Sequence, residues 1–163
     1  MELVPALARW IHFLAGITWV GLLYYFNLVQ MTALKAAAAD GTAIGINRHV
    51  APRALFWFRW SAVVTWLAGA ALLGAHFTDA FMLRNGFEVI GVGAWLGTIM
   101  LLNVWILIWP NQKKILGLVV ADEPARNAAR RVAMLASRVN MMLSLPMLFF
   151  MANGLSHRAV LGF

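Results

Sequence analysis

Four histidines are the side chains of this 163-residue chain that are best suited to chemistry, because neutral imidazole is the commonest metal ligand in proteins. They are His12, His49, His76 and His157. Two imidazoles from facing helices can hold a haem iron at its two axial positions. The chain has no cysteine, which excludes disulfides, iron–sulfur clusters, zinc–thiolate sites and covalently attached c-type haem. Histidine, methionine, carboxylate or backbone must therefore hold any metal or cofactor.

The composition indicates that these histidines belong to a membrane protein. Hydrophobic residues make up 63% of the chain and charged residues 12%, against roughly 45–50% and 25% in soluble domains. Four apolar stretches, about residues 6–29, 55–77, 89–109 and 132–153, each reach the roughly 20 residues that a membrane-spanning helix needs. We therefore predict an all-α fold, an integral membrane four-helix bundle that forms a single membrane domain over residues 1–163.

The connections between these spans carry their own signals. The alanine-rich segment from Gln30 to Ala54 predicts a short interfacial helix and a turn. The short connection at residues 78–88 predicts that the second and third spans are antiparallel neighbours. Asp122-Glu123-Pro124 predicts a helix start that runs on into the fourth span.

The distribution of basic residues predicts the orientation of the bundle. Ten of the thirteen lysines and arginines lie in or beside the first and third connections, and the others are Arg9, Arg84 and Arg158. Cytoplasmic loops of membrane proteins carry such an excess. We therefore expect a multi-pass protein of the bacterial inner (cytoplasmic) membrane, with both termini on the outer (periplasmic) side. The net charge of +7 has the same explanation, so we expect no nucleic-acid partner.

In this orientation His12, His76 and His157 lie toward the outer face, on or beside three different spans, whereas His49 lies in a cytoplasmic loop. An ionisable residue inside the membrane is by default a candidate functional residue. We expect these three histidines to provide the metal ligands of one haem b, with His12 and His76 as axial ligands and His157 as the substitute for either. The alternative is that His76 and His157, near the water interface, are simply solvated and that the deeper His12 has no ligating role.

Further residues near this face fit a haem. Gly16 and Gly69 would let a flat macrocycle approach the helix backbone, and Arg9 and Arg158 could pair with its propionates. Small residues also serve ordinary helix packing, which is the alternative explanation for the two glycines. The spacing of Gly93 and Gly97 likewise favours close packing within the bundle.

A second group of polar residues lies toward the cytoplasmic side. Its members are Arg59, Asn103, Arg138 and Asn140. A quinone or lipid site is one interpretation, and hydrogen bonds between helices with arginines that extend to the membrane surface are the other. The sequence shows no acid–base pair or nucleophile with a base, so we assign no catalytic residue.

Seven blocks of the sequence resemble the N-terminal membrane domain of the bacterial membrane-bound urate oxidases (urate hydroxylases). The blocks are residues 9–21 (RWIHFLAGITWVG), 50–60 (VAPRALFWFRW), 65–69 (TWLAG), 93–100 (GAWLGTIM), 103–113 (NVWILIWPNQK), 138–140 (RVN) and 145–151 (LPMLFFM). They follow one another through all four spans. The resemblance implies a short stand-alone relative without the additional helices and the C-terminal cytochrome c domain of the full-length members.

The resemblance also bears on single residues. His12 matches the family directly, and His157 matches with a shift of about two residues. Ser61 stands where the family usually has glutamate, and Gly91 stands where it tends to have histidine.

Together these observations predict a membrane-embedded b-type haem protein, an oxidoreductase subunit. It would pass electrons between a membrane donor and an outer-side c-type cytochrome or a larger membrane redox complex. The alternatives are a non-redox accessory subunit of a membrane complex and a urate-oxidase-like enzyme that needs a separate cytochrome. We expect the partners to be the lipid bilayer and one of these redox proteins, with a homo-oligomer as a further arrangement.

Overall fold

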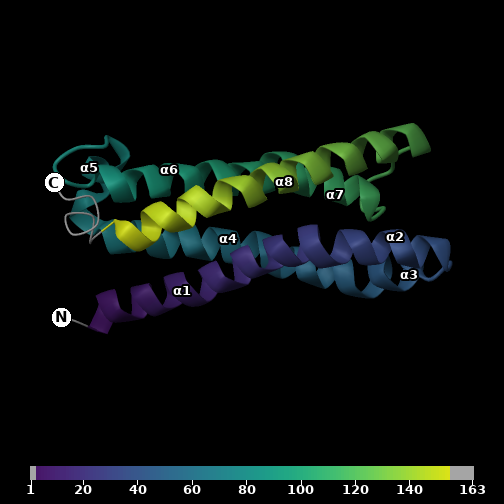
Figure 1. Ribbon diagram of the computed structural model, residues 1–163, viewed down its shortest axis with the longest axis horizontal. Coiled ribbons are helices and arrows are strands. Elements are labelled where there is room, and N and C mark those ends of the chain that lie inside the picture. Colours follow the sequence, from purple (N-terminus) through teal and green to yellow (C-terminus); the bar gives the residue numbers. More distant parts are fainter. Residues whose placement is uncertain (1–2, 155–163) are drawn as a thin grey trace.

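The structure is a computed structural model that describes residues 3–154. The described chain is all-α, and its helices form four long stretches that run back and forth beside one another (Figure 1). The start of α1 and the end of α8 lie at one end of this bundle, and the α2–α3 and α7–α8 turns lie at the other. The predicted four-helix architecture is thus confirmed.

The first stretch is a continuous helix made of α1 (Leu3–Tyr24), the π-helical segment η1 (Tyr25–Gln30) and α2 (Met31–Ala39). The chain turns at Gly41, whose φ of 72° is a conformation that favours glycine. The predicted helix and turn after Gln30 are both present, but the helix continues the first span instead of forming a separate short element. Alanine has the highest helix propensity, so the alanine-rich segment prolongs the first helix until Asp40 and Gly41 end it.

The second stretch starts directly after this turn. It consists of α3 (Ala43–Gly45), the π-helical segment η2 (Ile46–Val50) and α4 (Ala51–Leu73). Gly74, with φ of 51°, ends α4, and a short 3-10 segment, η3 (Gly74–His76), leads into α5 (Phe77–Phe81). The third stretch runs antiparallel to α4, as predicted, and comprises α6 (Glu88–Asn103), the π-helical η4 (Val104–Ile108) and α7 (Trp109–Ile115).

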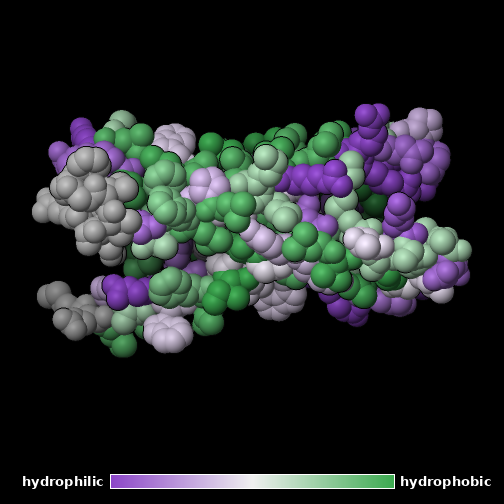
Figure 2. Space-filling model, viewed as in Figure 1, coloured by the Kyte–Doolittle hydropathy of each residue, from purple (hydrophilic) through white to green (hydrophobic). Residues whose placement is uncertain are grey.

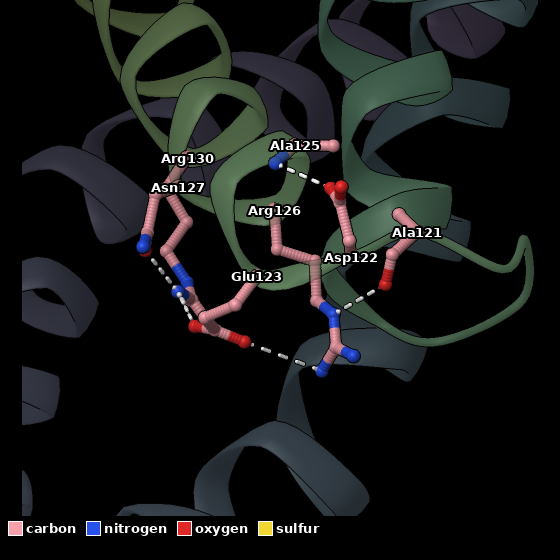
Figure 3. A network of polar contacts seen from close by, with 7 residues as sticks. All are labelled: Ala121, Asp122, Glu123, Ala125, Arg126, Asn127 and Arg130. Atoms are coloured by element: carbon pink, nitrogen blue, oxygen red, sulfur yellow. Dashed lines mark hydrogen bonds and ion pairs between the residues drawn. The ribbon is translucent and has the colours of Figure 1, made fainter.

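The fourth stretch, α8 (Glu123–Asn153), begins where the sequence predicts. The Asp122 carboxylate accepts a hydrogen bond from the backbone N–H of Ala125 at 2.9 Å, which caps the helix (Figure 3). Glu123 accepts a hydrogen bond from Arg130 at 3.2 Å and lies 3.7 Å from Arg126. These pairs are exposed, so they add little to stability and mainly shape the first turns of α8.

All four stretches are long and apolar enough to cross a membrane. They are Leu3–Ala39, Ala43–Phe81, Glu88–Ile115 and Glu123–Asn153, and each contains one of the predicted spans. Figure 2 shows hydrophobic surface over the middle of the bundle and hydrophilic side chains gathered at the end where α7 and α8 are joined. Large apolar side chains such as Trp10, Phe13 and Ile17 are exposed, as expected of a surface that meets lipid.

The core joins two helix pairs. α1 packs mainly against α4, and α6 packs mainly against α8. Trp19, Leu23, Phe58, Met100 and Val104 are fully or almost fully buried and fill the space between the pairs. This core fixes the rotation of each helix, and with it the direction in which the polar side chains described below point.

Candidate functional site

His12 lies on α1, and its ring packs against α4. The ring Nδ1 is 2.8 Å from the carbonyl oxygen of Thr65. Because a carbonyl oxygen can only accept a hydrogen bond, Nδ1 carries the hydrogen and donates it. In the neutral ring the lone pair then lies on Nε2, which is the atom that could bind a metal.

Gly69 makes room for this arrangement. It lies one helical turn after Thr65, and a Cβ built there would be 2.9 Å from His12 Cε1. Gly16 lies one turn after His12, and a Cβ there would be in ordinary contact with the Thr65 methyl group, at 3.6 Å. The structure therefore brings His12, Gly16 and Gly69 together at the α1–α4 interface. The close approach that Gly69 permits is that of the histidine ring itself.

His76 has different neighbours. Its ring is stacked on Phe87 with 4.4 Å between the ring centroids, and Nδ1 lies 3.7 Å from a carboxylate oxygen of Asp79. The side chain is 59% exposed. It follows Gly69 by seven residues and lies beyond the end of α4, so it lies closer to the end of the bundle than His12 does. The structure places both histidines toward the same end but gives no contact between them.

The surroundings of His76 form a small polar cap at this end of the bundle. One Asp79 oxygen accepts hydrogen bonds from Arg84 Nε and from Asn85 Nδ2, both at 2.9 Å. Arg84 and Asn85 belong to the tight turn between α5 and α6, in which Asn85 has a positive φ of 59°. Asp79 therefore holds the turn at Arg84 and Asn85 in place. This turn positions Phe87 so that its ring stacks on His76.

The other predicted site residues are dispersed. Arg9 is exposed on α1, one turn before His12, and forms no ion pair with any described residue. His49 is exposed toward the opposite end, but it lies in the π-helical η2 and not in the predicted loop. His157 and Arg158 lie outside the described residues, so their predicted roles stay predictions. Within residues 3–154 no group of three or more histidine, cysteine or acidic side chains could hold a metal ion, although a bis-histidine haem needs only two ligands.

The polar group predicted on the cytoplasmic side is only partly assembled. Asn103 Nδ2 donates to Asn140 Oδ1 at 2.7 Å and to the carbonyl oxygen of Ala136 at 2.9 Å. Asn140 is completely buried and donates to the carbonyl oxygen of Met100 at 3.0 Å. These bonds connect α6 to α8, which agrees with the interpretation as hydrogen bonds between helices.

The two arginines of that group point elsewhere. The Arg59 guanidinium lies over the Trp109 ring, 3.8 Å from its centroid, and Arg138 is exposed. The cation–π contact offsets part of the cost of placing Arg59 on a membrane helix. Neither arginine has a hydrogen bond to Asn103 or Asn140 in the described structure.

Sequence analysis missed several polar contacts to α8. Asn27 Nδ2 donates to Ser137 Oγ at 2.8 Å, and the Tyr24 hydroxyl lies 3.2 Å from Ser144 Oγ. Ser144 is completely buried. A usable signal was present, because Tyr24 and Asn27 are three residues apart and therefore share a helix face.

Comparison with known proteins adds one finding. A family model described as "Urate oxidase N-terminal" matches residues 75–159, just over half of the chain. No curated protein and no solved structure matches the chain. The matched segment contains α6 and α8, which supply Asn103 and Asn140, and it also contains His76.

Proposed function

This chain belongs to the urate oxidase N-terminal family, and from this membership and the geometry of His12 we propose that it is a membrane-embedded b-type haem protein. In this proposal it passes electrons between a membrane donor and an outer-side c-type cytochrome or a larger redox complex. The proposal includes both termini on the periplasmic side of the bacterial inner membrane, because the basic residues are concentrated on the loops at the opposite end.

The hydrogen bond from His12 to Thr65 is the observation that carries this proposal. Histidines that ligate metals almost always donate their other ring N–H to a carbonyl, a carboxylate or water, which fixes the ring and its tautomer. His12 has the same kind of hydrogen bond, since Nδ1 donates to the carbonyl oxygen of Thr65 and leaves the Nε2 lone pair for a metal. The same bond also satisfies a ring N–H that would otherwise be unpaired between two apolar helices, so the feature that supports ligation is the orientation of the ring with Nε2 left over.

We propose His76 as the second ligand, with His157 as its substitute. The Asp79 carboxylate lies 3.7 Å from His76 Nδ1, beyond hydrogen-bond distance, and would have to move closer to orient this ring as the Thr65 carbonyl orients His12. Bound haem would supply the one-electron chemistry. The chain would contribute ligation by the histidines, burial between helices, and pairing of Arg9 and Arg158 with the propionates, which together set the redox potential.

An absorption spectrum of the purified full chain tests the proposal. We expect a Soret band that sharpens on reduction, and we expect His12→Ala to abolish it while helix content stays unchanged. His49→Ala is the matched control, because His49 is exposed at the other end of the bundle and should leave the spectrum unaltered. A colourless, folded protein that takes up no added haem would sink the proposal.

The family match also supports a second candidate, a urate-oxidase-like enzyme that acts with a separate cytochrome. One structural feature speaks against it. Gly91 packs against the backbone of Ala80, so the histidine that the family tends to have at this position could not fit without moving α5. Urate consumption in the presence of added cytochrome c distinguishes this candidate from an electron carrier.

A further inference from the structure

Two open depressions adjoin one another on the surface of the α1–α4 pair. The first is lined by residues of α4 alone, which are Pro52, Arg53, Phe56 and Trp57. The second runs between the two helices and is lined by Ile17, Thr18, Gly21, Leu22, Ala54 and Trp57. Because Trp57 lines both depressions, they form one continuous surface groove, which we call the Trp57 groove.

The Trp57 groove changes in character along its length. The part between α1 and α4 exposes no polar surface, and its one hydroxyl, on Thr18, donates to the carbonyl oxygen of Leu14 at 2.9 Å. The other part carries the guanidinium of Arg53. One of its N–H groups donates to the carbonyl oxygen of His49 at 2.7 Å, which leaves four N–H donors of this charged group for a ligand. The groove is therefore apolar at one end and cationic at the other.

The cationic end lies at the edge of the membrane-spanning region. Arg53 precedes the second predicted span, residues 55–77, by two residues, whereas Gly21 lies eight residues inside the end of the first, residues 6–29. α1 and α4 run antiparallel, so the groove leads from Arg53 toward the middle of the bundle (Figure 1). A molecule that fills it would have its polar head at the membrane surface and an apolar chain in the hydrocarbon layer. This is the layout of a phospholipid.

The charge at the outer end favours an anionic headgroup. Arg53 and Arg48, which is also exposed and lies five residues earlier in η2, form no ion pair with a carboxylate in the described part of the chain. A guanidinium presents its N–H donors in a planar fork that matches the oxygens of a phosphate. A neutral head, such as that of a quinone, would leave these positive charges uncompensated.

We propose that the Trp57 groove binds one anionic phospholipid, with its phosphate on Arg53 and one acyl chain along Trp57, Gly21 and Ile17. Glycine at position 21 keeps the path of the chain open, because a Cβ built there would meet no atom within 4 Å. The tryptophan beside the headgroup end is typical of the membrane–water interface. The site uses no histidine side chain, so it does not depend on haem binding.

Native mass spectrometry of the full chain tests the site. The protein is released from micelles that contain equal amounts of phosphatidylglycerol and phosphatidylcholine with identical acyl chains, so that only the headgroup differs. We expect one retained phosphatidylglycerol, favoured several-fold over phosphatidylcholine. Equal retention of the two lipids overturns the proposal. Displacement of phosphatidylglycerol by inorganic phosphate, but not by sodium chloride of the same ionic strength, also overturns it, because the site would then bind a free anion.

Two variants separate the headgroup contact from the chain contact. Arg53→Gln should lower the retention of phosphatidylglycerol about five-fold, which is the usual contribution of one basic residue to binding an anionic lipid surface, and should leave phosphatidylcholine unchanged. Gly21→Leu should lower the retention of both lipids, since the new side chain occupies the path of the acyl chain. Neither change disturbs the fold, because Arg53 is exposed and position 21 faces open space.

Each variant has a matched control. Arg131→Gln removes a positive charge from an exposed position of α8, and Ala71→Leu adds the same side chain at an exposed position of α4 far from Trp57. Neither should change lipid retention. Equal losses in Arg53→Gln and Arg131→Gln would reveal unspecific attraction of charge and overturn the proposal. A dimer that Gly21→Leu dissociates would overturn it as well, because a second copy of the chain would then fill the groove.

Discussion

The carbonyl oxygen of Thr65 on α4 holds the Nδ1 hydrogen of His12 on α1 at a donor–acceptor distance of 2.8 Å. This bond does two things at once. It links the two helices that pack most extensively against each other, and it fixes the tautomer of the ring. The ring reaches Thr65 only because position 69, one turn away, has no side chain.

Alanine at position 69 is therefore expected to displace His12 with little change in stability. The added Cβ would lie 2.9 Å from Cε1, so the ring must swing aside and its hydrogen bond lengthens. A gain in helix propensity of about 1 kcal/mol and the loss of a hydrogen bond worth about 1 kcal/mol should nearly cancel. The nitrogen-15 chemical shift of His12 Nδ1 reports the displacement. Gly21→Ala, where nothing lies within 4 Å of the new Cβ, should leave that shift unchanged, and identical shifts in both variants would contradict the prediction.

Asn103 and Asn140 should be energetically coupled. Asn140→Leu leaves the half-buried Asn103 amide without one of its two acceptors, and we expect a loss of about 1–3 kcal/mol in the free energy of unfolding. The double variant with Asn103→Leu should lose less than the sum of the single losses, with a coupling of about 1 kcal/mol, as is usual for hydrogen bonds between membrane helices. Unfolding in mixed micelles measures the free energy of unfolding of the wild type, the two single variants and the double variant. Strictly additive losses would show that the bond contributes nothing.

Gly91→Ala is expected to be one of the costliest glycine substitutions in the chain. Its Cβ would collide with the backbone carbonyl oxygen of Ala80, which cannot move without shifting α5. Overpacking of this kind costs about 1–3 kcal/mol. Gly97→Ala, on the same helix with nothing within 4 Å of the new Cβ, should instead be neutral or stabilising. Thermal unfolding of the two variants side by side checks the difference, and equal melting temperatures would refute it.

The absence of cysteine from the sequence gives a clean test of orientation. Met82 and Val120 are exposed at opposite ends of the bundle, so each can be replaced by a single cysteine. We expect a membrane-impermeant maleimide added to spheroplasts, whose outer membrane has been opened, to label Met82→Cys. It should label Val120→Cys only after the inner membrane is disrupted. The reverse pattern would place the termini in the cytoplasm.

The sequence predicted the parts of the fold that depend on local pattern. The four spans follow from runs of apolar residues, and the start of α8 follows from Asp122 and Pro124, because capping and proline chemistry act within a few residues. The segment after Gln30 was predicted only in part, because its helix and turn are present but the helix continues the first span. The preceding turn, η1, has long-range contacts that a local pattern does not reveal, such as the bond of Asn27 to Ser137, which is 110 positions later in the chain.

The candidate site was harder to predict than the spans. Sequence placed His12, Gly16 and Gly69 near one face, and the structure brings all three into one helix interface. The sequence could not show that Thr65 would be the partner of His12. This pairing depends on the rotation and depth of α1 and α4, which are fixed by the core residues Trp19 and Phe58. Similarly, the stacking of His76 on Phe87 depends on the conformation of the turn between α5 and α6, which Asp79 holds through Arg84.

The long first helix exceeds the thickness of a bilayer. From Leu3 to Ala39 it has 37 residues, roughly 55 Å at 1.5 Å per residue, whereas the hydrocarbon layer is about 30 Å thick. No ordinary tilt would bury such a helix completely. Its exposed side chains change accordingly, from Trp10, Phe13 and Ile17 in the first half to Ala33, Lys35 and Ala38 beyond η1. A helix of this length is longer than the bilayer is thick, so in any membrane that it spans one end of it, continuous with the part that carries His12, would extend beyond the hydrocarbon layer.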